Sequence, residues 1–293
     1  MEHVTFVEHT SLTRPAMICA FRGWNDGGEA ATVAARYLIE HWETRPLAYL
    51  DPEEFFDFQV SRPTVRLEGG VSRTIEWPRG EFHVASPGPR DVVLFISNEP
   101  NVRWRTFTGQ IVGTAKELGV ELLVTLGAFL TDVPHSRPVP VVGSADGEDV
   151  AARLGLTRSQ YEGPTGIVGV LHDTSNRSGV PSVSLWAAVP HYLPSAPNPK
   201  AALALITRAA DLLAVPIDTG PLEAGAARWE ESVAGLLAGS EELSEYVSRL
   251  EASSDEVSSD DEEAGPGDVE VPSADALAAE VERFLREQDR GSS

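Results

Sequence analysis

Pro15–Phe21 (PAMICAF) and the glycine-rich segment Gly23–Gly28 (GWNDGG) decide the fold class. The first segment is apolar throughout, which is typical of a strand that is buried in a sheet. After the glycines, Glu29–Trp42 places apolar residues on one face with helical spacing. A strand that leads through a short turn into a helix is the basic unit of α/β proteins. This stretch therefore predicts an α/β fold.

Later segments extend the same pattern. Asp91–Ser97 (DVVLFIS) is apolar along its whole length, as expected for a central strand covered on both faces. Asn101 is expected to cap the helix that follows, and Gly119 to end it. Further strands are expected at Leu47–Leu50, Glu121–Leu126 and Val183–Val189, and a further helix at Asn198-Pro199. Together these segments predict a mixed sheet with helices on both faces.

The segment between residues 56 and 85 has a different pattern. Thr64–Leu67, Thr74–Trp77 and Glu81–Val84 alternate apolar and polar residues, and glycines and a proline separate them. Alternation is typical of strands that face the core on one side only. We therefore expect one antiparallel meander with one solvent-exposed face.

The chain divides into four parts by composition. We expect an α/β core at residues 1–221, a helical extension at 222–252, a disordered acidic linker at 253–272 and a terminal amphipathic helix at 273–290. The formal net charge is −22, and residues 240–293 hold 17 acidic residues against four arginines. The linker has acids, Ser, Gly and Pro but almost nothing apolar, so it cannot form a core of its own.

Composition also excludes several classes of protein. Cys19 is the only cysteine, so an intramolecular disulfide, a zinc ribbon and an iron–sulfur cluster are excluded, and its apolar neighbours predict a buried thiol. No apolar run approaches the ~18 residues that cross a membrane, and the first residues lack a signal-peptide pattern. We expect a cytoplasmic protein that binds no membrane. Because no cluster of Lys and Arg is present, nucleic-acid binding is not expected either.

Two loops that follow predicted strands hold candidate binding residues. The first contains Trp24, Asn25 and Asp26, at the sheet edge where α/β proteins usually bind ligands. The competing interpretation, which we favour, is that Asp26 or Asn25 caps the next helix. The second loop contains Asn98 and Glu99, which either bind a polar group or form a turn. Downstream of it, Arg103 either holds an anion or pairs with a surface acid.

A third loop, residues 129–138, contains His135 and Arg137. Its Asp, Ser and His invite comparison with a hydrolase, but no G-x-S-x-G motif occurs in the chain. A recognition surface fits this proline-stiffened loop better than a nucleophile does. The segment Gly163–Gly166 is either a turn or the entrance to a helix. We assign no catalytic residue, and because no metal-ligand spacing occurs among the histidines we expect no metal and no cofactor.

Several blocks in order resemble the proteasome assembly chaperone family, and above all its actinobacterial members of the second-chaperone type. The blocks are Gly23–Glu29, Ser97–Trp104, Leu126–Pro138, Gln160–Asp173 and Ser184–Lys200, and the similarity spans about residues 5–250. It implies a phosphorylase-like mixed sheet flanked by helices, self-association into a homo-oligomer such as a trimer, and proteasome subunits as partners. Some relatives outside bacteria dock through a C-terminal hydrophobic–tyrosine–any motif, whereas this chain ends Asp289–Ser293 without one.

Two hypotheses on function follow. The first is a binding protein, rather than an enzyme, that assists the assembly of a multi-subunit complex. The second is a protein or enzyme that binds a nucleoside or a phosphorylated metabolite at the carboxyl edge of the sheet. The second requires six side chains to converge on one cavity: Asn25, Asp26, Asn98, Glu99, His135 and Arg137. Phosphate would need a cationic cradle, for which Arg22, Arg103 and Arg137 are the candidates.

Overall fold

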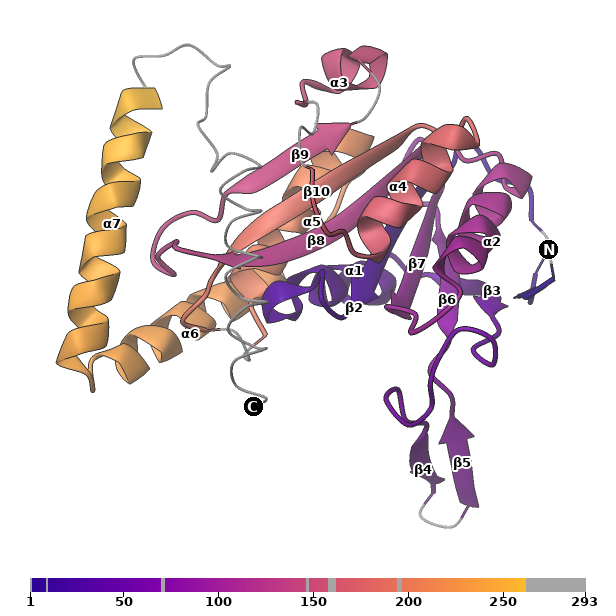
Figure 1. Cartoon of the computed structure of the whole chain (residues 1–293), viewed down its shortest axis with the longest axis horizontal. Helices are drawn as coiled ribbons and strands as arrows, with labels where there is room; N and C mark the ends of the chain where they lie inside the picture. The colour runs from indigo at the N-terminus through magenta and orange to yellow at the C-terminus, as the bar shows by residue number, and fades with distance from the viewer. Residues whose placement is uncertain are drawn as a thin grey trace.

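The computed structural model describes residues 2–8, 10–69, 72–145, 148–157, 162–193 and 197–261 (Figure 1). The strands are β1 (Val4–Phe6), β2 (Ala16–Arg22), β3 (Arg45–Leu50), β4 (Thr64–Glu68), β5 (Ser72–Glu76), β6 (Gly80–Ala85), β7 (Val92–Asn98), β8 (Leu122–Thr131), β9 (Val141–Ala145) and β10 (Ser182–Pro190). The helices are η1 (Gly27–Glu29), α1 (Ala30–His41), α2 (Trp104–Glu117), α3 (Glu148–Leu154), α4 (Ile167–Arg177), α5 (Pro199–Leu213), α6 (Gly220–Leu237) and α7 (Glu241–Asp261). The terminal helix expected at residues 273–290 lies outside the described residues.

Eight strands form one mixed sheet in the order β1-β3-β6-β7-β2-β8-β10-β9. The central strands β7, β2, β8 and β10 are parallel, and the strands on either side of them pair antiparallel. The predicted mixed sheet flanked by helices is therefore confirmed. The continuous apolar runs fall on β2 and β7, as expected of strands that are buried on both faces.

Helices cover both faces of this sheet and bury two large apolar clusters. The face that carries Ile18 and Leu94 packs against α1 and α5, and α6 lies on α5. The opposite face, with Cys19 and Phe95, packs against α2 and α4. Cys19 is fully buried, as predicted, and burial raises the pKa of its thiol. Such a thiol contributes to the packing of the core and does not act as a nucleophile.

The expected meander is wrong in one respect. Only β6 joins the main sheet, where it pairs with β3 and β7, whereas β4 and β5 form a separate two-stranded sheet. Figure 1 shows this hairpin projecting from the body of the molecule, and we call it the arm. Alternation of apolar and polar residues predicts strands, but it carries no information on which sheet a strand joins.

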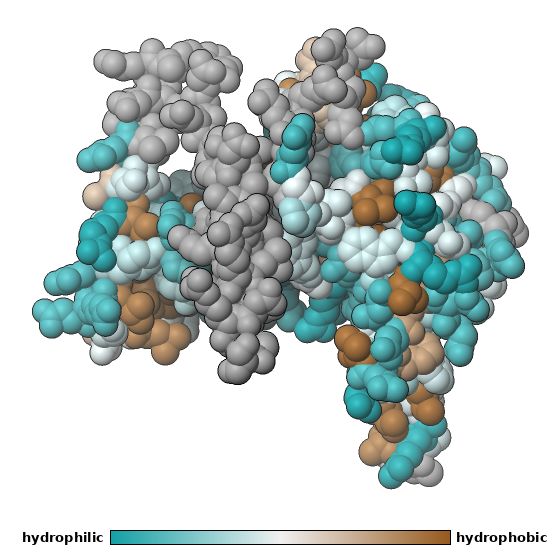
Figure 2. Space-filling view, viewed as in Figure 1, coloured by the Kyte–Doolittle hydropathy of each residue, from teal (hydrophilic) through white to brown (hydrophobic). Residues whose placement is uncertain are grey.

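The arm also exposes both of its faces. The register pairs Val65 with Ile75 and Leu67 with Arg73, so the apolar side chains share one face. These side chains are not buried, since Val65 is 58% exposed, Leu67 62% and Ile75 53%. In Figure 2 the projecting part of the molecule accordingly shows hydrophobic surface.

Helix boundaries confirm one predicted cap and correct two other predictions. Asn198 Oδ1 accepts a hydrogen bond from the Ala201 N–H at 2.9 Å and caps α5, as expected. Asn101 does not cap α2, because its Oδ1 accepts from the Asp57 N–H instead. Helix α7 continues to Asp261, through part of the range in which a disordered linker was expected. Acidic composition suggested disorder there, but contacts with the body hold the helix, as described below.

Candidate functional site

Glu99 joins three segments at the carboxyl edge of the sheet. Its Oε1 accepts hydrogen bonds from Asn25 Nδ2 at 3.1 Å and from the Ile167 N–H at 3.0 Å, and its Oε2 accepts from the Trp24 N–H at 3.4 Å. Because Ile167 is the first residue of α4, the carboxylate lies at the positive end of that helix. Asn25 is 1% exposed and lies against Gly166. This junction fixes loop geometry and leaves Glu99 little freedom to bind a ligand.

Asp26 caps helix α1, as the favoured interpretation of its loop predicted. Its carboxylate accepts from the Ala31 N–H at 2.8 Å, the Thr32 N–H at 3.2 Å and Thr32 Oγ1 at 2.5 Å. Burial raises the pKa of Asp26, and the hydrogen bonds from Thr32 and Ala31 oppose that shift. These hydrogen bonds occupy both carboxylate oxygens of Asp26 within the fold, so little of the carboxylate is left to bind a ligand.

The other candidates in these two loops lie in separate places. The Trp24 side chain is 44% exposed. Asn98 lines a cavity together with Arg22. Arg103 pairs with Glu54 and lies over the ring of Phe55, so it ties α2 to the neighbouring loop.

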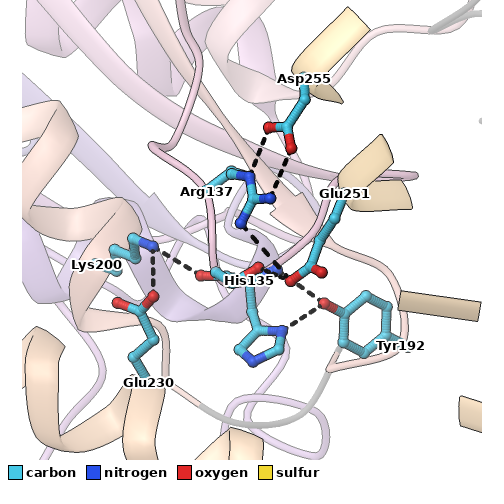
Figure 3. Close-up of polar contacts among 8 residues, drawn as sticks. His135, Arg137, Tyr192, Lys200, Glu230, Glu251 and Asp255 are labelled. Atoms are coloured by element: carbon cyan, nitrogen blue, oxygen red, sulfur yellow. Dashed lines mark hydrogen bonds and ion pairs between the residues drawn. The ribbon is translucent and has the colours of Figure 1, made fainter. Parts of the chain in front are cut away.

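His135, which is buried, and Tyr192, which is half-buried, form a polar pair (Figure 3) that contacts Trp229 of α6 and Tyr246 of α7. The His135 N–H donates to the Tyr192 oxygen at 2.8 Å, and Nδ1 of His135 lies 2.9 Å from the same oxygen. The hydroxyl of Tyr192 therefore accepts from the backbone N–H, and the tautomer of the imidazole sets whether Nδ1 accepts from this hydroxyl or donates to it. Lys200 donates to the His135 carbonyl at 2.7 Å and pairs with Glu230 of α6 at 3.2 Å.

Burial keeps the imidazole of His135 neutral. Burial lowers the pKa of His135, and Lys200 acts in the same direction, while Glu230 and Glu251 oppose them. Burial likewise raises the pKa of Tyr192 to about 12. Both side chains are therefore uncharged near pH 7, which suits a structural hydrogen bond.

The loop around His135 also carries the contacts that hold α7. Arg137 donates two hydrogen bonds to Asp255, each at 2.7 Å, and lies 3.8 Å from Glu251 (Figure 3). Ser136 donates to Glu251. Nearer the start of α7, Tyr246 donates to Asp132 at 2.8 Å. We call Asp132, Ser136 and Arg137 the α7 contact surface.

The polar side chains of this loop are engaged with the C-terminal helices. Ser136 donates to Glu251 and not to His135, so the Asp, Ser and His of this loop form no proton relay in the described contacts.

Over the described ranges, no three His, Cys, Asp or Glu side chains gather closely enough to hold a metal ion. None of the helices in the described part of the chain is long and apolar enough to cross a membrane.

The second hypothesis required six side chains to meet at one cavity, and their contacts divide them into groups. Asn25 and Glu99 bond each other, Asp26 caps α1, and Asn98 lines a different space. His135 and Arg137 contact the C-terminal helices. Each of the three candidate cradle arginines pairs with a different acid: Arg22 with Glu29, Arg103 with Glu54 and Arg137 with Asp255.

Sequence reasoning missed the partners of His135 and Arg137. Tyr192, Lys200 and Glu230 come from segments far along the chain, and Glu251 and Asp255 lie where a helix was expected to end and a linker to begin. The available signal was the basic Arg137 facing a long acidic segment, and it does not specify which acids pair.

Comparison with known proteins agrees with these observations. The family model described as PAC2 family matches residues 20–237. A PAC2 family protein from Streptomyces avermitilis is 49% identical, with a TM-score of 0.75, over 80% of this chain and 99% of that one. A proteasome-assembly chaperone homologue from Mycobacterium tuberculosis is 43% identical, with a TM-score of 0.72, over 79% and 99%.

A more distantly related solved structure shares the fold. A Pyrococcus furiosus archaeal proteasome activator is 19% identical, with a TM-score of 0.65, over 80% of this chain and 99% of that one. Among curated proteins none matches this chain. The family model covers most of the chain and two relatives exceed 40% identity, so the resemblance predicted from the sequence is confirmed. The chain belongs to the PAC2 family.

Proposed function

We propose that this protein is a non-enzymatic, self-associating cytoplasmic binding protein that assists the assembly of a multi-subunit complex, in the first instance the proteasome. The family and the name of the Mycobacterium tuberculosis relative support this direction. Self-association comes from the family resemblance. The observation that carries the proposal is the exposed apolar face of the arm.

The exposed apolar face of the arm is of the kind that binds a partner protein. A two-stranded hairpin is at best marginally stable by itself in water, and exposed apolar patches commonly mark sites of protein contact. Val65, Leu67 and Ile75 lie next to one another on the arm, each more than half exposed. Strand β5 has all five residues exposed, so within the described chain nothing covers it.

The charges on the arm indicate the chemistry of the partner. Arg73 lies on the apolar face, opposite Leu67, and it has no ion-pair partner in the described part of the chain. On the other face, Arg66 pairs with Glu76 at 2.5 Å, so that face is already satisfied. An apolar row with one free cation fits an apolar patch that is bordered by carboxylates. We assign this occupant to a client subunit of the assembling complex.

The test is an affinity purification of the tagged full chain from its own host, with quantitative mass spectrometry of the co-purified proteins. The variant combines Leu67→Ser with Ile75→Ser, and Thr64→Ser on the polar face of the same hairpin is the matched control. Wild type and Thr64→Ser are expected to recover proteasome subunits in near-integer ratio. The double variant is expected to lose at least about tenfold of that recovery, because truncated apolar anchors dominate interface energy.

The particle size measured by light scattering distinguishes client binding by the arm from self-association through the arm. Both variants are expected to keep the oligomeric state of the wild type, since the arm is assigned to the client. Equal recovery of subunits by the double variant would refute the arm as the client site. Loss of the oligomer in the double variant, with no client recovered by any form, would assign the arm to a second copy of the chain and overturn the proposal.

A further inference from the structure

Strands β2 and β7 are neighbours and parallel, yet the helices that follow them lie on opposite faces of the sheet. Helix α1 follows β2 and packs in the cluster with α5, whereas α2 follows β7 and packs in the cluster with α4. Such a reversal opens a crevice beyond the carboxyl ends of the two strands, and α/β proteins bind their ligands there. Here the ends are Arg22 and Asn98, which face each other in the register.

A cavity of about 330 Å³ lies at this crevice. The ends of β2 and β7 line it through Arg22, Ser97 and Asn98. One side comes from α1 through Arg36, and another from the base of the arm through Trp77 and Arg79. The volume is within the range of small-molecule sites.

The lining is cationic although the protein is strongly acidic. Three arginines and one carboxylate, Glu81, line the cavity in a chain of formal net charge −22, and one of these arginines, Arg22, pairs with Glu29 outside the lining at 2.9 Å. The carboxylate of Glu81 is paired within the lining, with Arg79 at 2.9 Å and with His83 at 3.3 Å. The hydrogen bond from His83 lowers the pKa of Glu81 to about 2, with Arg79 in support and burial in opposition. Arg36 is exposed and has no ion-pair partner among the described residues.

One buried group in the lining also lacks a partner. Ser97 is 5% exposed, and its hydroxyl makes no hydrogen bond within the described part of the chain. Buried hydroxyls are nearly always paired in folded proteins, so an unpaired one beside a cavity indicates a missing acceptor or donor. A phosphate oxygen accepts hydrogen bonds from both a hydroxyl and a guanidinium.

The arm supplies the part of the lining that suits a ring. Trp77 is 47% exposed, and Phe58 supports its indole edge-on at a centroid distance of 4.8 Å. Ile39 lines the same cavity from α1. An aromatic and an aliphatic surface beside a cationic end fit a planar ring that carries an anion.

We propose that this cavity binds a small phosphomonoester with a planar ring, of the nucleoside monophosphate class. The phosphate lies against Arg36, within reach of the Ser97 hydroxyl and beside Arg22, which keeps its pair with Glu29. The ring lies against Trp77. This site is separate from the client surface of the arm and from the α7 contact surface. It uses Asn98 and Arg22 from the second hypothesis, but the remaining lining residues differ.

Isothermal titration of the full chain tests the site with three probes: AMP, adenosine and inorganic phosphate. AMP is expected to bind, inorganic phosphate to bind more weakly and adenosine not at all. Arg36→Gln is expected to raise the Kd for AMP about tenfold or more, because it removes a charge-assisted contact. Arg105→Gln, an exposed arginine on α2 in the opposite layer, is the matched control and is expected to leave the Kd unchanged. Trp77→Ala is expected to weaken AMP but not inorganic phosphate.

Three results would overturn the proposal. The first is no heat of binding for AMP at millimolar concentration with folded wild type. The second is an equal Kd for AMP in wild type and Arg36→Gln, which would place the ligand elsewhere. The third is binding of adenosine as tight as that of AMP, since the phosphate would then contribute nothing.

Discussion

Gly166 occupies a position where a single methyl group matters. A Cβ built there would lie 2.2 Å from Asn25 Oδ1, although the backbone angles of φ −89° and ψ −173° suit any residue. The restriction is therefore steric rather than conformational. It protects the hydrogen bond from Asn25 to Glu99 and, through Glu99, the start of α4.

Replacing Gly166 by Ala should lower the free energy of unfolding by about 1–3 kcal/mol, as overpacking usually does. Gly109→Ala is the matched control. Gly109 lies inside α2 with no atom within 4 Å of an added Cβ, so alanine there should add about 0.5–1 kcal/mol. Urea denaturation of both variants measures the difference. A Gly166→Ala protein as stable as Gly109→Ala would contradict the role given to the junction.

His135 should make stability depend on pH on the acid side. Burial holds its folded-state pKa below the ordinary 6.5, so below that pH the unfolded chain binds a proton that the folded chain does not. Its contribution is thus fully present above pH 6.5 and is lost as the pH falls. The free energy of unfolding should drop less between pH 7.5 and 5.5 in His135→Gln than in wild type. Identical pH dependence in the two proteins would show that His135 is protonated as easily in the fold as outside it.

At the scale of elements, the sequence predicted what depends on local chemistry and missed what depends on tertiary pairing. The apolar run of β7 and the cap of α5 by Asn198 follow from residue type and spacing, and both are confirmed. From the sequence, the strands of the arm were predicted to form one meander with β6, because the alternation of apolar and polar residues is the same in either sheet. The short strand β9 was missed, since it is an edge strand of mostly half-buried residues in a proline-rich segment.

The candidate site shows the same division. The role of Asp26 as a cap could be predicted, because helix caps are local. The link between Asn25 and Glu99 spans 74 positions, and Arg36 looks like any exposed residue inside a helix until the cavity is seen. Loops at strand ends were the right places to search, but the partners come from elements that only the fold brings near.

Helix α7 rests on the body mainly through polar contacts. Val247 is its one fully buried apolar side chain within the described residues, so the pairs to the α7 contact surface should limit its opening. Arg137→Gln is expected to raise hydrogen exchange of the amides in residues 241–256 a few-fold while α5 stays protected. Arg177→Gln, which breaks a surface pair with Asp173 within α4, is the control and should leave α7 unchanged. Unaltered exchange of α7 in Arg137→Gln would mean that packing alone holds it.

At the scale of the whole molecule, the α7 contact surface lies apart from the arm and the cavity, which adjoin each other. The arm projects from the body well away from α7 (Figure 1), and the cavity lies where the arm meets the sheet edge. Beside the α7 contact surface, a third and small apolar cluster includes Trp229 of α6 and Tyr246 of α7. A change at the α7 contact surface can therefore be studied without disturbing the other two sites, whereas Trp77 connects the arm to the cavity.

The exposed arm has a meaning for how such proteins diversify. Val65, Leu67 and Ile75 are absent from both large buried clusters, so substitutions at these positions escape the selection that stability imposes on β2 or β7. With the arm as the proposed client site, relatives that share the same scaffold could acquire different partners by changes in this one hairpin. Exchange of residues 60–76 between two relatives, which leaves Trp77 of the cavity in place, should transfer the choice of partner.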